Sequence, residues 1–284
     1  MNDTSRREDE IDAPASLALV HEQDRDRSLA MPFVPTEKKG AWAALHAFDI
    51  ETARIRDLVS QPLPGEIRLQ WWRDLISGGG SGGSGHPIAD ELLATIDRHD
   101  LPRAAFERFL EARIFDLYDD PFPSTGDLEG YAGETQSTLI MLSASILSPE
   151  DARAVSDAAG HAGVAVLVAS LLRRLPVHLR RGWCPVPLDL LVAAGCTQED
   201  FLRANAEPSS RAVSVFCAFG REHDARWRAH LADLPKPLRA AFLPASLASS
   251  YIDAAEKLGP GLRNGPVEIG PVGKTWRYWR TMRS

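Results

Sequence analysis

Residues 45–76 carry the pattern that most constrains the fold, an amphipathic helical repeat that reaches a proline-rich corner and then resumes. Phe48, Thr52, Ile55 and Val59 recur at intervals of four, three and four residues, which is one face of a 3.6-residue period. Elsewhere in the chain the alternating apolar and polar runs typical of strands are nearly absent. An all-α fold is therefore predicted.

The corner is Pro-Leu-Pro-Gly at 62–65, which is predicted to end the first helix and turn the chain, with a second helix starting near Glu66. Glu51, Arg54 and Asp57 lie three residues apart and share a face of the first helix away from its apolar stripe. Two charge-bearing helices folded against each other can direct polar groups into a shared cavity. The plainer alternative is a helical hairpin whose charges are solvated.

The chain divides by composition into three parts. Residues 1–26 are acidic and polar and are expected to form a flexible arm, residues 27–258 a helical domain, and residues 259–284 a Gly/Pro-rich and then basic-aromatic tail. A Gly/Ser tract at 77–85 is interpreted as a surface loop within the domain, with a lid over a cavity as the alternative.

Composition limits the possible partners and the compartment. A net charge of −7 argues against a nucleic-acid partner, because such proteins usually present basic surfaces. The three cysteines show no C-x-x-C spacing, which favours reduced, buried thiols over a zinc site. No apolar secretion segment opens the chain, and uncharged runs fall short of the roughly 20 residues that span a bilayer. A cytoplasmic protein, soluble or peripheral to the inner membrane, is expected.

The tail interleaves cations with aromatic rings. Within 273–284, Lys274, Arg277, Arg280 and Arg283 alternate with two tryptophans and a tyrosine. This mixture suits the headgroup region of a membrane or an acidic partner. Docking of the aromatic rings onto the domain itself is the slightly favoured alternative.

Three blocks of sequence, in order, resemble the squalene/phytoene synthase family. They are ALHAFDIETARIRD, EIRLQWWRD, and the long segment HAGVAVLVASLLRRLPVHLRRGWCPVPLDLLVAAG, within a similarity that spans roughly residues 20–255. The resemblance implies an isoprenoid-synthase-type helical bundle around a central cavity. In that family two D-x-x-x-D pairs, each one helical turn apart, hold Mg²⁺ against a prenyl diphosphate.

This chain departs from the family at those metal positions. The first pair falls on Ala53 and Asp57, and the second on Arg174 and His178, so one carboxylate of four is present. A guanidinium has no acceptor atom and repels a cation that needs oxygen ligands. Asp49 lies eight residues from Asp57, about 12 Å along a helix, and is a poor replacement. No catalytic residue and no cofactor are assigned on this basis.

The departures are similar to those of a divergent branch of the family, the respiratory complex I (NADH dehydrogenase) assembly factor and its bacterial relatives. That branch keeps the fold and is regarded as non-enzymatic, which implies a respiratory-complex protein as partner and an isoprenoid or lipid as a further possible ligand. Two rivals stay open: a plain lipid carrier, and an active prenyltransferase with a rearranged magnesium site. The second rival requires Glu51, Asp57 and Asp74, or the aspartates at 116, 119 and 120, to hold the metal.

Several polar and aromatic side chains are candidates for ligand binding. Arg173, Arg180 and Arg181 form a possible anion-binding patch, with a solvated charge run as the alternative. Asp57 and Glu51 are weak metal candidates, and the aspartates near 116–120 are interpreted as a solvated helix end. The full set of ligand-binding candidates is Arg54, Arg68, Gln70, Trp72, Arg173, Arg174, His178, Arg180 and Arg181.

Overall fold

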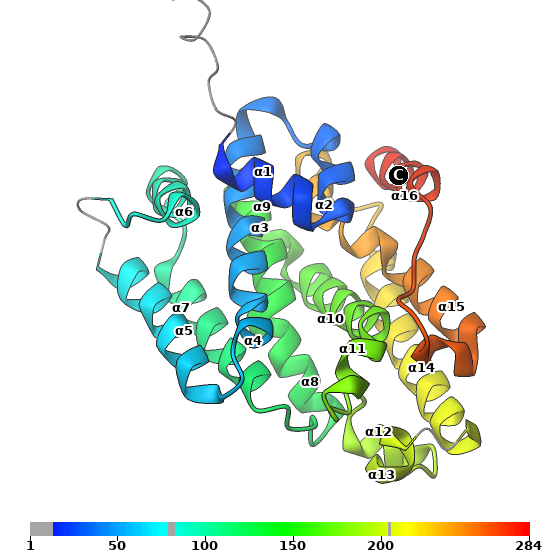
Figure 1. Ribbon diagram of the computed structural model, residues 1–284. Helices are drawn as coiled ribbons and strands as arrows, with labels where there is room; N and C mark the ends of the chain where they lie inside the picture. Colours follow the sequence, from blue (N-terminus) through cyan, green and yellow to red (C-terminus); the bar gives the residue numbers. More distant parts are fainter. Residues whose placement is uncertain (1–13, 79–82, 204–205) are drawn as a thin grey trace, which may run out of the picture.

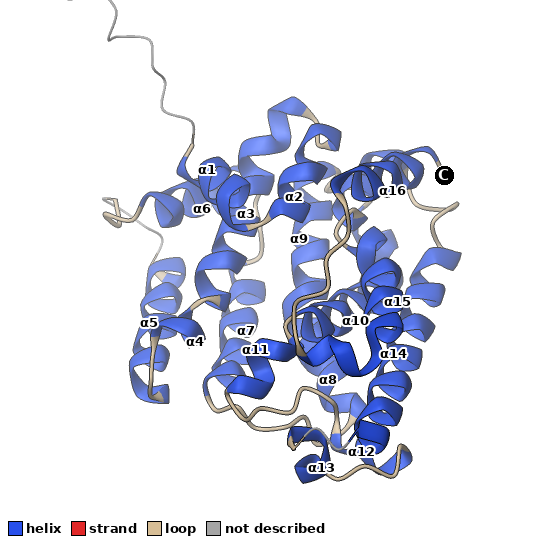
Figure 2. Ribbon diagram, turned by 45° about the vertical axis from the view of Figure 1, so that its right-hand side comes forward, coloured by secondary structure: helices blue, strands red, loops and turns tan. Residues whose placement is uncertain are grey.

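The computed structural model describes residues 14–78, 83–203 and 206–284, and within them all regular structure is helical (Figures 1 and 2). The predicted all-α class is confirmed. The Gly/Ser tract predicted as a loop lies partly outside the described residues.

The first half of the chain contains α1 (Ala15–Gln23), α2 (Arg25–Ala30), η1 (Met31–Phe33), η2 (Thr36–Lys38), α3 (Lys39–Ala53), α4 (Ile55–Leu58), α5 (Pro62–Ser77), α6 (Pro87–Arg98), α7 (Arg103–Arg113), η3 (Ile114–Leu117), α8 (Thr125–Ala132), the π-helical turn η4 (Gly133–Ser137) and α9 (Thr138–Leu147). The second half contains η5 (Ala152–Val155), α10 (Ser156–Arg173), α11 (Leu175–Arg180), α12 (Leu188–Ala193), α13 (Gln198–Leu202), α14 (Ala206–Ala229), η6 (Lys236–Phe242), η7 (Ala245–Leu247), α15 (Ala248–Leu258), η8 (Gly259–Arg263) and α16 (Pro271–Arg283).

Helix α10 runs through the middle of the bundle and packs against α14 and α15 (Figure 1). Its sequence is rich in alanine and valine, and small side chains let neighbouring backbones approach. The closest approach is at Gly163, where an added Cβ would lie 2.5 Å from the backbone nitrogen of Ser137 in η4. By length and composition the segment Ala152–Arg173 is apolar enough to cross a membrane, but 67% of it is buried in the fold, as in the core helix of a globular domain.

A second apolar cluster forms around α3. Phe48 makes ring contacts with Trp72 of α5 at 5.3 Å and with Phe106 and Phe109 of α7 at 5.5 and 5.1 Å between centroids. These contacts hold α3 between the α5–α7 pair on one side and the α10 core on the other. The apolar stripe predicted for the first helix is thus the face that builds this cluster.

The Pro-Gly corner has a different place from the one predicted. The first helix ends at Ala53 and continues as the short helix α4, and α5 then begins at Pro62 rather than after the two prolines. Proline is favoured in the first turn of a helix, where its missing N–H has no partner to lose. Pro176 occupies the same position in α11, at the break after α10.

The expected flexible arm is wrong for residues 15–26, which form α1 and the start of α2, while residues 1–13 lie outside the described residues. Val20 is fully buried, and Glu91 of α6 accepts the backbone N–H groups of Ala15 and Ser16 at 2.7 and 3.1 Å. The arm is therefore part of the bundle. Helix α16 of the tail is docked as well, with Lys274 and Tyr278 buried beneath it.

Candidate functional site

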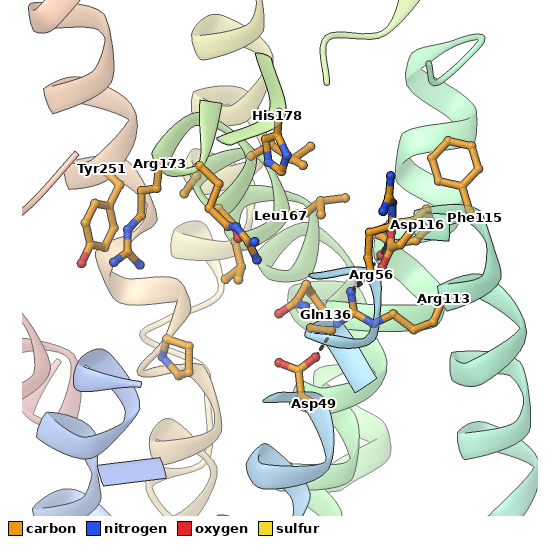
Figure 3. A pocket seen from close by; sticks show the side chains of 18 of the residues that line it. Asp49, Arg56, Arg113, Phe115, Asp116, Gln136, Leu167, Arg173, His178 and Tyr251 are labelled. Atoms are coloured by element: carbon orange, nitrogen blue, oxygen red, sulfur yellow. Dashed lines mark hydrogen bonds and ion pairs between the residues drawn. The ribbon is translucent and has the colours of Figure 1, made fainter. Parts of the chain in front are cut away.

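A cavity of about 240 Å³ opens between α2, α3, α7, α10 and α15 (Figure 3). Apolar side chains, among them Phe115, Leu167 and Leu171, form part of its wall. The rest of the lining is dominated by charge. Its six aspartates and six arginines are Asp24, Asp26, Asp49, Asp57, Asp116, Asp119, Arg27, Arg56, Arg113, Arg173, Arg174 and Arg181.

Asp49 of α3 is the most buried of these carboxylates and is held between two guanidinium groups. Arg27 of α2 lies 2.7 Å from its Oδ2, and Arg113 of α7 donates to its Oδ1 (Figure 3). Burial alone would raise the pKa of Asp49, but the two guanidinium groups outweigh it and hold that pKa below its usual value. Asp49 is therefore an anion engaged on both sides.

The solvated helix end that the sequence suggested for the aspartates near 116–120 is wrong for Asp116 and Asp119, whereas Asp120 is exposed. Asp116 and Asp119 line the cavity, and each has a cationic partner. Asp116 accepts from Tyr131 at 2.7 Å and from Arg113 at 3.1 Å, and Asp119 pairs with Arg56. Asp116 lies in η3, directly after α7, and Asp119 follows in a turn where it adopts a positive φ of 53°.

Asp57 faces the second family motif across the cavity. Arg174 Nη2 lies 3.0 Å from Asp57 Oδ2, and Arg181 donates to Oδ1. Burial raises the pKa of Asp57, but the hydrogen bonds and charges of Arg181 and Arg174 lower it further, to below its usual value. Ala53, Asp57, Arg174 and His178, the four positions that the resemblance assigns to the family's metal-binding aspartates, all line this one cavity.

His178 is buried among these charges without a hydrogen-bond partner on either ring nitrogen. Its ring packs edge-on against Trp183, with centroids 4.5 Å apart. Burial, and then the charges of Arg174 and Arg181, lower the pKa of His178 to about 3. At neutral pH it is an uncharged imidazole that can offer one donor and one acceptor to a molecule in the cavity.

Asp26 of α2 joins the cavity to the C-terminal helix. Its Oδ2 accepts from Arg173 at 2.9 Å and from Tyr251 of α15 at 2.7 Å, and its Oδ1 forms an ion pair with Lys274 of α16 at 2.6 Å. Tyr278 donates to the Asp26 backbone carbonyl at 3.0 Å. One residue of the supposed arm therefore connects α2, α10, α15 and α16.

The structure brings together four of the predicted ligand-binding residues, Arg173, Arg174, His178 and Arg181. The other candidates are not among the residues that line this cavity: Arg54 pairs with Glu51 at 3.1 Å, Gln70 bonds to Asp74 at 2.6 Å, Trp72 packs on Phe48, and Arg68 and Arg180 are exposed. Their role in binding stays a prediction.

Sequence reasoning missed Arg27, Arg56 and Arg113 and dismissed Asp49. One signal was available, because Asp49 is a lone carboxylate in the otherwise apolar run AWAALHAFDI, where an unpaired charge would be costly. Arg113 likewise follows Phe109 by one helical turn on a buried face. The partners of these residues come from distant segments, which no local spacing reveals.

The residues present do not fit the magnesium site that the family resemblance implies. Mg²⁺ needs carboxylate oxygens free to coordinate it in octahedral geometry. Here Asp49, Asp57, Asp116 and Asp119 each bind a guanidinium. Among the described residues no three His, Cys, Asp or Glu side chains gather as a metal site.

Comparisons with known proteins bear on this geometry. A family model described as squalene/phytoene synthase matches residues 20–271. The chain is 34% identical over 198 residues to NADH dehydrogenase (ubiquinone) complex I, assembly factor 6, of Rattus norvegicus, which covers 69% of this chain and 59% of that relative. It therefore spans little more than half the length of that protein. Phytoene synthase of Thermus thermophilus is 27% identical over 211 residues, 72% of this chain and 69% of the enzyme.

The fold has solved counterparts. Squalene synthase HpnC from Alicyclobacillus acidocaldarius superposes with a TM-score of 0.69 at 19% identity, covering 88% of this chain and 94% of that one. Identity at this level shows a common fold alone. The predicted isoprenoid-synthase-type architecture is confirmed.

Proposed function

The chain belongs to the squalene/phytoene synthase family, and we propose that it is a catalytically inactive member that supports assembly of respiratory complex I through a protein partner. The observation that carries the proposal is the direct ion pair between Asp57 and Arg174, which takes the place of a shared metal at two of the family's metal positions. Arg181 forms a second ion pair with the same carboxylate.

The electrostatics of the whole cavity support the same proposal. A prenyl diphosphate held by Mg²⁺ requires an excess of carboxylate, whereas this lining has equal numbers of aspartates and arginines. The alternative magnesium site of Glu51, Asp57 and Asp74 is disfavoured as well. Asp74 lies on the exposed face of α5 and is not among the cavity-lining residues, and Glu51 is paired with Arg54.

The proposed role in complex I assembly rests on the similarity of this chain to a protein named for that process. The rat protein with 34% identity is named for complex I assembly, and it is more similar to this chain than the phytoene synthase at 27%. Because this chain spans 59% of that relative, the function of the whole relative comes here as a proposal. We expect the protein to work on the cytoplasmic side, at or near the inner membrane.

The proposal includes a ligand for the cavity, an isoprenoid or another lipid with an anionic head, bound without magnesium. The neutral His178 has no hydrogen-bond partner on either ring nitrogen, and the half-buried Arg173 lines the same cavity. Apolar side chains such as Leu167 and Phe115 offer a surface for a hydrocarbon chain. The lipid ligand and the assembly role are independent proposals, so a failure of the first does not overturn the second.

The assembly role is tested by deleting the gene in the source organism and measuring complex I on native gels together with NADH dehydrogenase activity. Loss of assembled complex, restored by the wild-type gene and equally by an Asp57→Ala variant, supports a non-catalytic role. Restoration by the wild type but not by Asp57→Ala would instead support the prenyltransferase. Normal complex I in the deletion strain would overturn the proposal.

The ligand is tested by calorimetric titration of the purified protein with farnesyl diphosphate, with and without Mg²⁺. Binding that does not depend on magnesium and weakens in a His178→Phe variant supports a lipid or isoprenoid site. Binding that requires magnesium, with formation of a condensed product, would revive the enzyme. Absence of binding would remove the ligand from the proposal.

A further inference from the structure

Helix α16 has two faces of different chemistry. Lys274, Tyr278 and Thr281 recur at four and three residues and are buried against the bundle. Phe33 of η1 contacts the Tyr278 ring at 6.0 Å, and Arg239 of η6 donates to the Met282 carbonyl at 3.2 Å near the end of the helix. The helix is therefore fixed in rotation, and its opposite face is permanently turned outward.

That outward face carries large aromatic side chains. Trp276 and Trp279 are 51% and 45% exposed, and Val272 at the start of the same face is 82% exposed. Exposing two indoles costs hydration free energy unless something covers them. In an amphipathic helix that lies at a membrane surface, tryptophans of this kind occupy the headgroup region.

The same face is cationic. The Arg280 guanidinium lies 4.9 Å from the Trp276 ring centroid, and that of Arg283 lies 4.5 Å from the Trp279 ring. These contacts place each positive charge beside an indole that has a nonpolar surface and a polar N–H. No acidic residue occurs in α16, although the chain as a whole has a net charge of −7.

The elements packed against α16 do not cancel this charge. They are α2, η1, η6 and η7, and the only acidic residue in their sequences is Asp26, whose carboxylate is already bound to Lys274 and Arg173. The same elements add two exposed cations, Arg25 and Lys236. Glu268, in the loop before the helix, is 65% exposed, but its carboxylate lies 3.9 Å from Lys274 on the opposite face of α16 from the tryptophans.

We propose that the outward face of α16, formed by Val272, Trp276, Trp279, Arg280 and Arg283, is a docking surface for a bilayer of anionic phospholipid. The cations attract the negative surface, and the indoles then enter the headgroup layer. The proposal rests on α16 and its neighbours and is independent of the role in complex I assembly.

A second exposed apolar surface provides an internal comparison. Leu63, Ile67 and Trp71 form a stripe along α5 and are 65%, 63% and 40% exposed. Charges of both signs flank this stripe: Glu66 accepts from Tyr118, Arg73 bonds to Glu111 at 2.7 Å, and Arg68 is exposed. A stripe flanked by acidic and basic side chains lacks the all-cationic surroundings of α16, so Trp71 supplies a matched control for the tryptophans of α16.

The test is sedimentation of the full chain with vesicles of phosphatidylcholine alone or with about 30% phosphatidylglycerol. We expect binding to the anionic vesicles, release by 0.5 M NaCl as screening shortens the reach of charge, and little binding to neutral ones. Trp276→Ser/Trp279→Ser and Arg280→Gln/Arg283→Gln should each weaken binding about tenfold or more, since each cation near such a surface contributes appreciably.

The control variant Trp71→Ser should bind as the wild type does. Because all four substituted side chains of α16 point outward, thermal unfolding of the variants should match that of the wild type. Failure of the wild type to bind anionic vesicles, including the case in which it binds an acidic protein instead, would overturn the proposal. Equal loss of binding in Trp71→Ser, or unchanged binding in both α16 variants, would overturn it as well.

Discussion

Arg174 and Asp57 are joined directly, with Nη2 3.0 Å from Oδ2, at two positions that the family resemblance assigns to metal-binding aspartates. The substitution at 174 replaces an anion by a cation. The guanidinium thus does for Asp57 what a metal would otherwise do, since it neutralises the carboxylate and ties α4 to the end of α10.

The strength of that pair should be small. Both side chains are more than a third exposed, so solvent screens the interaction and a coupling of about 0.5–1 kcal/mol is expected. Urea unfolding of Asp57→Asn, Arg174→Gln and the double variant measures the coupling. A coupling above roughly 3 kcal/mol would contradict this account, because it would require a dry, unscreened pair.

Asp49 should behave in the opposite way. Asp49→Asn leaves Arg27 and Arg113 buried without their shared anion, and breaking a buried pair from one side typically costs about 3–5 kcal/mol. The free energy of unfolding should fall by this amount. The control is Asp74→Asn on α5, an exposed carboxylate bonded only to Gln70, where a change of about 0.5 kcal/mol or less is expected. Similar losses in the two variants would refute the central role of Asp49.

Some features of the fold were predictable from the local sequence, and the exact start of one helix was not. The helical class and the α3 stripe follow from local spacing, because helix formation depends on neighbours three and four residues apart. The predicted start of α5, near Glu66, lies after the observed start at Pro62, because a proline can end one helix and can also stand in the first turn of the next.

The site was predictable only where a family motif marked it. Arg174 and His178 were found because they stand at metal positions, and both line the cavity. Asp26 was missed because it lies in the polar segment that was predicted to be a flexible arm, and Arg27 directly follows that segment. Their partners Asp49, Arg173 and Lys274 are distant in sequence. Charge pairs between residues more than 20 positions apart leave no periodic signal.

Stability should decline on mild acidification because of His178. Its pKa is about 3 in the folded protein and near 6.5 when the chain is unfolded, so between these values only the unfolded chain takes up the proton. Stability is therefore full above pH 6.5 and falls as the pH decreases, by about 1.4 kcal/mol at pH 5.5 for this group. The measurement is urea unfolding at pH 7.5 and 5.5.

The variant His178→Gln should show a smaller loss between these two pH values, by about 1 kcal/mol. An unchanged pH dependence in His178→Gln would mean that the imidazole is protonated as easily in the folded protein as in the unfolded chain.

Gly160 and Gly163 of α10 lie three residues apart and test how closely α10 packs against η4, two elements that both line the cavity. A methyl group at Gly163 would meet the Ser137 backbone at 2.5 and 2.8 Å, so Gly163→Ala must push η4 away from α10. Overpacking of this kind typically costs about 1–3 kcal/mol. At Gly160 nothing lies within 4 Å of the added methyl group, and alanine is the better helix former by about 1 kcal/mol. Thermal unfolding should therefore show a lower midpoint for Gly163→Ala and an equal or higher one for Gly160→Ala. A Gly163→Ala variant as stable as the wild type would mean that η4 and α10 can separate without loss.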